Sequence, residues 1–197
     1  MLMNTIQTTE TIYYLEMLQP GHLVAKQKAD CPLDVRQSLL PSPELSRFFY
    51  TTVGGDWRWV DRLKWTYSQW QTWVTRPGYG LWIAYVSDTP VGYFELDGEA
   101  GGEVELAFFG LLPQFTNRGW GGTLLTQAVQ EAWAKPAKRV WLHTCSFDHP
   151  RAIPNYQARG FRLYRTETIP KEMPAAPLGP WPGADKRHEE SAQQFAK

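Results

Sequence analysis

The chain has 197 residues, of which 43% are hydrophobic and 20% charged, and its 20 basic and 20 acidic side chains give a formal net charge of zero. This length and composition predict a soluble domain, and the balanced charge argues against a nucleic-acid-binding protein, which needs a surplus of Lys and Arg. Two cysteines are too few for a disulfide framework, and no stretch has the cationic start of a secretory signal or the ~20 apolar residues of a membrane helix, so we expect a cytoplasmic protein without membrane association.

The first half of the chain predicts one strand and two helices. Residues 11–18 are rich in β-branched and aromatic side chains, which is typical of a strand. Ser42 is placed to cap a helix over residues 43–52, and Ser68 is placed to cap a second helix over residues 68–76.

Three closely spaced strands follow, over residues 81–86, 91–96 and 103–112, and their short connections imply antiparallel hairpins. An amphipathic helix then leads to a strand over residues 139–145, and a strand–helix–strand unit of this kind predicts a parallel crossover. The buried face of that helix is marked by the spacing of Leu124, Leu125, Ala128, Val129, Ala132 and Trp133.

The last elements expected are a helix over residues 149–159 and a strand over residues 161–169. Pro154 removes one hydrogen bond from this helix, so we expect the helix to start late. The whole pattern predicts an α/β fold, with a mostly antiparallel mixed sheet, one parallel βαβ crossover and helices on both faces. We expect a single domain over residues 1–170 and a tail over residues 171–197 that is rich in Pro, Gly and charge.

The strongest chemical signal lies between the third hairpin strand and the amphipathic helix. Glycines there let backbone N–H groups approach a ligand, and the helix start adds unpaired donors and a positive dipole end, which together suit a pyrophosphate. A plain tight turn is the alternative, since glycine-rich turns before helices are common. Neither the Rossmann nor the P-loop glycine pattern is present. The segment reads Thr116-Asn117-Arg118-Gly119-Trp120-Gly121-Gly122.

From the strand before this loop onward, the chain resembles the GNAT superfamily of acetyl-CoA-dependent N-acetyltransferases. The superfamily's cofactor loop, Gln/Arg-x-x-Gly-x-Gly/Ala, is matched at Gly119 and Gly121, while Thr116 stands where Gln or Arg is usual. A second signature, Asn-x-x-Ala-x-x-x-Tyr-x-x-x-Gly-Phe, is similar to residues 149–161, with His149 in place of Asn.

The resemblance implies that acetyl-CoA is the co-substrate, that no metal is needed, and that an amine attacks the thioester directly in a ternary complex. It also implies that the strand before the loop splays from its neighbour, so that the backbone of Phe109, Gly110 and Leu111 pairs with the pantetheine arm. The implied cofactor site is completed by residues 116–122 of the loop and by His149.

Two residues are implied to act in catalysis. Glu105 is similar to the glutamate that serves as base in histone acetyltransferases of the superfamily, and Tyr156 matches the tyrosine that protonates the departing thiolate. The alternatives are that Glu105 is salt-bridged or solvated and that Tyr156 packs in the core.

The acceptor site is predicted from charged and aromatic side chains outside the loop. We expect a small-molecule primary amine held by cation–π contact and charge, with core and capping roles as the alternative. A histidine here could relay a proton, whereas a metal site with Cys145 lacks a fourth ligand. The candidates are Asp56, Trp57, Glu95 and His143.

Two other functions stay open at this point, a catalytically silent acyl-CoA sensor and a protein or peptide N-acetyltransferase. Nothing in the sequence sets the oligomeric state, so a homodimer is open as well.

Overall fold

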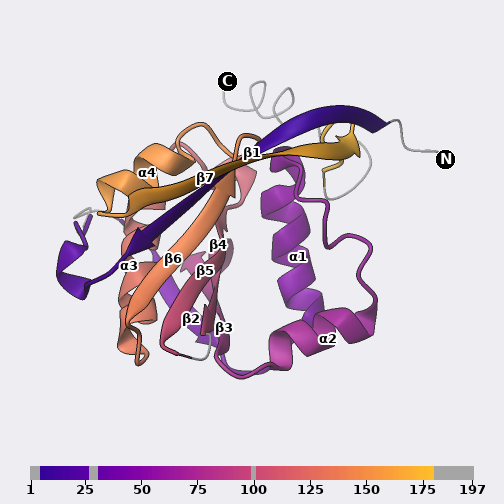
Figure 1. Cartoon of the computed structure of the whole chain (residues 1–197). Helices are drawn as coiled ribbons and strands as arrows, with labels where there is room; N and C mark the ends of the chain where they lie inside the picture. The colour runs from indigo at the N-terminus through magenta and orange to yellow at the C-terminus, as the bar shows by residue number, and fades with distance from the viewer. Residues whose placement is uncertain (1–4, 27–30, 99–100, 180–197) are drawn as a thin grey trace, which may run out of the picture.

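A computed structural model of the chain describes residues 5–26, 31–98 and 101–179. Figure 1 shows one central sheet with α1 and α2 on one side and α3 and α4 on the other. In chain order the helices and strands are β1 (Thr5–Met17), β2 (Asp34–Ser38), α1 (Pro43–Gly54), α2 (Tyr67–Thr75), β3 (Tyr79–Val86), β4 (Thr89–Gly98), β5 (Glu103–Leu111), α3 (Gly121–Ala134), β6 (Arg139–Cys145), α4 (Ala152–Ala158) and β7 (Arg162–Pro174).

The described strands form one sheet in the order β2-β3-β4-β5-β6-β1-β7. Only the β5–β6 pair is parallel, and α3 connects these two strands, while the other neighbours pair antiparallel. The predicted fold class is therefore confirmed, including the single parallel crossover.

Side chains of β4 alternate between the two layers of core. Tyr93 faces α1, where its ring stacks on Phe49 with centroids 4.9 Å apart. Its neighbour Phe94 points to the opposite side and stacks on Trp82 in the layer beneath α3. The predicted apolar face of α3 is buried in that layer, at Leu124, Leu125, Ala128, Val129 and Ala132.

Helix ends follow local side-chain chemistry. Ser42 caps α1 as predicted, because its hydroxyl accepts a hydrogen bond from Leu45 N. The predicted cap of α2 is wrong: Thr66, not Ser68, is the N-cap, and it forms a capping box in which Gln69 Oε1 accepts from Thr66 N.

The last helix starts late, as Pro154 led us to expect. Its first residue is Ala152 rather than His149, so α4 has seven residues. Gly160 ends this part of the chain with a left-handed φ of 98°, a conformation that glycine adopts without strain.

The edge strand β7 and its neighbour β1 are longer than predicted. β1 begins at residue 5 rather than 11, and β7 continues past residue 169 to Pro174. They pair with each other along almost their whole length, and Figure 1 shows them side by side. Residues 180–197 of the expected tail lie outside the described residues. Within the described part of the chain, no helix is long and apolar enough to cross a membrane.

Candidate functional site

The two parallel strands of the sheet separate shortly after they begin to pair. Their pairing covers Glu103–Arg139, Val104–Val140 and Glu105–Trp141, after which β5 and β6 continue without pairing to each other. The β4–β5 register also shifts there, since Glu95 pairs with Phe108 and Leu96 with Leu106. This bulge turns β5 away from β6 and leaves one edge of its backbone without a strand partner.

A cavity of about 250 Å³ lies beside that free edge. The predicted cofactor residues line it, except Arg118 and Trp120. Its walls come from β5, from the glycine-rich loop, from α4 and from the end of α1, at Phe109, Gly110, Leu111, Thr116, Asn117, Gly119, Gly121, Gly122, His149, Val53, Trp57, Trp59, Lys26, Asp148, Arg151, Ala152, Asn155 and Tyr156.

The glycine-rich loop presents the start of α3 to this cavity. Asn117 and Gly119 adopt left-handed φ values of 60° and 80°, which turn the chain sharply into the helix. Among the described residues, no side chain caps the first turn, so its N–H groups keep their hydrogen-bonding capacity. A Cβ atom on Gly121 would have no described neighbour closer than Asn155 Nδ2, at 3.9 Å, so the described part of the chain leaves the space in front of this turn open. The donor set and the space fit a diphosphate.

Positive charge reaches the same helix start from residues that the sequence did not reveal. A Cβ atom on Gly122 would meet Arg159 Nη1 at 2.5 Å and Lys26 Cδ at 2.6 Å, so both cations lie over the first turn of α3. Lys26 is fixed there because its backbone N–H donates to Thr126 Oγ1 at 2.9 Å. Lys26 belongs to no helix or strand and to no motif, so nothing in the sequence pattern could have identified it.

The cation predicted in the glycine-rich loop, Arg118, lies outside the cavity lining. Arg118 is exposed and does not line the cavity, and its guanidinium lies 5.4 Å from the ring of Trp120. Trp120 is buried in the core and stacks on Phe115.

Tyr156 lies on α4 with its side chain largely buried against the cavity. Burial raises the pKa of its phenol, and the charge of Asp148 adds to this effect. The phenol therefore keeps its proton at neutral pH and is able to donate it. Its hydroxyl makes no hydrogen bond within the described residues.

Asp148 is held by three donors between β6 and α4. Its Oδ2 accepts from Thr144 Oγ1 at 2.6 Å and from Cys145 N at 3.0 Å, and its Oδ1 accepts from Trp59 Nε1 at 2.9 Å. Trp59 comes from the segment after α1, so this carboxylate joins two walls of the cavity. No local sequence pattern predicts this contact, since the two residues lie 89 positions apart.

His149 lines the cavity in its neutral form. Burial lowers the pKa of its imidazole, and the charge of Arg151 lowers it further. Its ring packs edge-on against Trp57, with centroids 4.9 Å apart. Asp56 and Trp57 border a second hollow beside Thr116 and His149, so these two acceptor candidates lie next to the loop.

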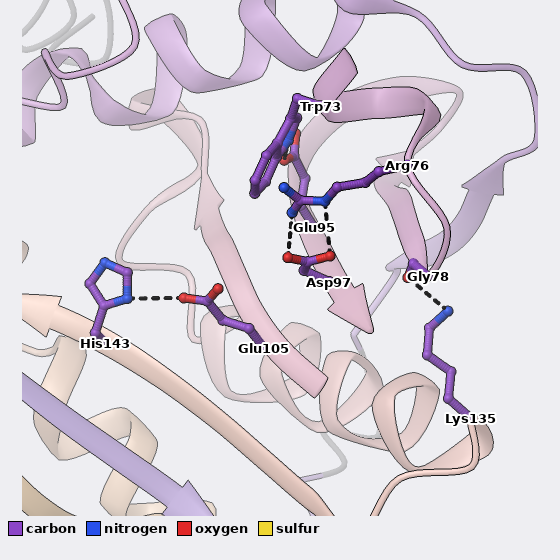
Figure 2. Close-up of polar contacts among 8 residues, drawn as sticks. All are labelled: Trp73, Arg76, Gly78, Glu95, Asp97, Glu105, Lys135 and His143. Atoms are coloured by element: carbon purple, nitrogen blue, oxygen red, sulfur yellow. Dashed lines mark hydrogen bonds and ion pairs between the residues drawn. The ribbon is translucent and has the colours of Figure 1, made fainter. Parts of the chain in front are cut away.

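The other two acceptor candidates, His143 and Glu95, lie on the α1–α2 side of the sheet. Figure 2 shows His143 and Glu105 facing each other from neighbouring strands, with Nδ1 and Oε1 3.0 Å apart. The His143 side chain is 48% exposed, whereas that of Glu105 is 12% exposed. The hydrogen bond to Glu105 raises the pKa of His143, so the imidazole protonates more readily than usual.

Glu95 is almost fully buried on the same side, on β4. Its carboxylate accepts from Ser46 Oγ at 2.6 Å and from Trp73 Nε1 at 2.8 Å. Burial raises the pKa of this carboxyl. Within the described residues, no group of three or more His, Cys, Asp or Glu side chains is placed to hold a metal ion.

Comparisons with solved structures identify proteins of similar fold. A GCN5-related N-acetyltransferase from Kribbella flavida has a TM-score of 0.58 at 19% identity, and the match covers 87% of this chain and 61% of that one. A GCN5-related N-acetyltransferase from Sphaerobacter thermophilus has a TM-score of 0.62 at 15% identity, with 86% of this chain and 53% of that chain covered. This chain thus spans less than two thirds of either relative.

A third solved structure is matched over a larger share of its own length. It is an acetyltransferase from Bacillus subtilis in complex with CoA, with a TM-score of 0.52 at 17% identity, and the match covers 68% of this chain and 78% of that one. A comparison with curated proteins gives no match. The protein-family model described as "Acetyltransferase (GNAT) family" matches residues 42–161, which is more than half of the sequence. This chain therefore belongs to the GNAT acetyltransferase family.

Proposed function

We propose that the protein transfers an acetyl group from acetyl-CoA to a primary amine of a small molecule, in a ternary complex. The observation that carries this proposal is the free backbone edge of β5, which runs from the Glu105–His143 pair to a cavity that also holds Tyr156 and the uncapped start of α3. The CoA bound by the Bacillus subtilis relative is consistent with such a site.

Binding is assigned to the backbone and to three cations. The N–H groups around Gly119 and Gly121 hold the diphosphate, with Lys26, Arg151 and Arg159 supplying positive charge around it. Acetyl-CoA supplies the acyl group: a C–N bond forms to the amine as the C–S bond breaks.

Proton transfers are assigned to side chains. The protonated amine must lose one proton to attack and a second as the amide forms. Glu105 accepts these protons in turn, and the half-exposed His143 passes each to solvent. Backbone N–H groups at the free edge of β5 donate to the carbonyl oxygen as it gains negative charge. Tyr156 donates its proton to the departing sulfur and regains one from solvent, so the products are an acetylated amine and the free thiol.

The test is thiol release from acetyl-CoA in the presence of a panel of amines. Turnover with small amines supports the proposal, and turnover only with peptides would assign the protein to the peptide acetyltransferases. Tight CoA binding without turnover for any acceptor would contradict the proposal and favour the acyl-CoA sensor.

A further inference from the structure

Arg62 lies in a cage of aromatic rings on the α1–α2 side of the sheet. It belongs to the segment between α1 and α2. Its guanidinium carbon lies 3.5 Å from the ring centroid of Trp73 and 4.4 Å from those of Trp65 and Phe108. Three rings around one positive group form the arrangement that recognises organic cations.

A buried carboxylate makes this cage still more favourable for a cation. Glu95 is 1% exposed, and its charge is felt by Arg62. Trp73 connects the two, since its ring packs on Arg62 while its Nε1 donates to Glu95 Oε2. The hydroxyl of Tyr93, which also interacts electrostatically with Glu95, is buried without a hydrogen-bond partner in the described residues.

The guanidinium of Arg62 does not have all of its hydrogen bonds in this cage. Its Nη1 is buried and has no hydrogen-bond partner, and it forms no ion pair within the described part of the chain. Arg76 packs on Trp73 as well, at 3.2 Å, but unlike Arg62 it has an ion-pair partner, because its Nε donates to Asp97 Oδ1 at 2.9 Å, as Figure 2 shows. A buried donor without a partner is unfavourable, so the cage does not satisfy every hydrogen-bonding group of its own arginine.

The cage adjoins the region assigned to chemistry. Phe108 forms one of its walls and packs on Trp59, which lines the cavity, with ring centroids 5.1 Å apart. The charge of Arg62 also lowers the pKa of His143, against the raising effect of Glu105, so the guanidinium is close enough to act on that pair. A positive group held in this cage therefore acts electrostatically on the pair to which the proton transfer is assigned.

We infer that the cage of Trp65, Trp73 and Phe108 over Glu95 is a cation subsite of the acceptor, and that Arg62 fills it until the acceptor displaces it. This inference rests on the proposed function. Because the attacking amine must be neutral, the caged cation is a second basic group on the same molecule. The acceptor class is thus a diamine or an amine that carries a guanidinium.

The first experiment tests the cage without any turnover. Arg62→Ala empties it, and millimolar guanidinium chloride should then raise the melting temperature of this variant in a saturable way. Urea has the same shape without the charge and should not do so. The matched control is Arg36→Ala, which removes an exposed guanidinium 5.0 Å from the single ring of Tyr85 and should show no saturable effect. Equal responses of Arg62→Ala to guanidinium and urea would overturn the inference.

The second experiment uses the unaltered protein and so does not depend on the folding of a variant. A diamine and a monoamine of equal length are compared as acceptors, and we expect kcat/KM to be higher for the diamine by about tenfold or more, the ratio that a desolvated cation–π contact supports. Equal values would overturn the inference while leaving the proposed function intact. No acetylation of any amine would contradict the proposed function, and the guanidinium experiment alone would then decide on the cage.

Discussion

Trp59 Nε1 and Asp148 Oδ1 lie 2.9 Å apart and connect the segment after α1 to the turn after β6. Both residues line the cavity beside β5, and Asp148 is held in addition by Thr144 and Cys145. The indole thus bridges two walls that belong to opposite sides of the gap between β5 and β6.

Removing this bridge should weaken coenzyme A binding. Trp59→Phe keeps a ring but loses the donor to a carboxylate, an interaction that contributes about 1.5–3 kcal/mol. We expect the dissociation constant for CoA, measured by calorimetry, to rise about tenfold. Trp133→Phe is the control, since its indole Nε1 donates to Met17 Sδ and neither residue lines the cavity. An unchanged affinity in Trp59→Phe would show that the two walls are held by other contacts.

Glu105→Gln should change both the rate and its pH dependence. The variant loses the proposed base, so we expect kcat to fall by about a hundredfold or more while CoA binding persists. It also replaces the charged acceptor of the hydrogen bond that raises the pKa of His143 with a neutral amide, so the acidic limb of the residual pH–rate profile should move to lower pH. If kcat stays at the level of the unaltered protein, Glu105 is not the base.

The same pair should make stability depend on pH in a defined direction. Because the pKa of His143 is raised in the folded state, the pair stabilises the protein fully below the unfolded pKa of about 6.5 and loses this effect as pH rises through the folded pKa. The melting temperature of the unaltered protein should therefore exceed that of Glu105→Gln most at acidic pH. In a His143→Asn background this difference should no longer vary across that range.

Tyr156→Phe should slow turnover without loss of cofactor. The phenol keeps its proton because burial raises its pKa, and its removal leaves the thiolate without a donor. We expect kcat to fall about a hundredfold, with the CoA dissociation constant nearly unchanged. Tyr164→Phe, on the exposed strand β7, should keep full activity. Equal activity of the two variants would assign Tyr156 to packing.

Gly121→Ala separates binding from folding. The added methyl group has room in the unliganded protein, where its nearest neighbour lies 3.9 Å away, and alanine is a better helix residue than glycine. We expect an unchanged or higher melting temperature together with a CoA dissociation constant raised about tenfold, because the methyl group occupies the space in front of the helix start. Unchanged CoA affinity would place the diphosphate elsewhere.

Strong periodic patterns predicted most of the fold. The apolar face of α3 and the β5–α3–β6 crossover could be derived because helix periodicity and strand spacing are local signals. The strand β2 was missed because Asp34–Ser38 is short and polar, and only its pairing with β3 makes it a strand. Likewise the threonine-rich start of β1 lacks alternating hydrophobic residues and is ordered by β7.

The candidate site was predictable where it follows a motif and not where it depends on tertiary contact. The loop and Tyr156 could be placed from the resemblance to the GNAT motifs, whereas Lys26 and the Trp59–Asp148 bridge depend on segments that meet only in the folded chain. Local sequence patterns also could not predict which of the acceptor candidates lie close together. Trp57 lies by the loop, while Glu95 lies beneath the cage of Arg62.

The short parallel pairing between β5 and β6 has a mechanical consequence for the whole molecule. Strands β2 to β5 form one half of the sheet and β6, β1 and β7 form the other, and three residue pairs join the two halves. A ligand that hydrogen-bonds to β5 in the gap replaces part of the missing backbone pairing between the halves. Occupancy of the cleft should thereby stiffen both halves at once, and amide protons far from the ligand, along β1 and β7, should exchange more slowly when it is bound.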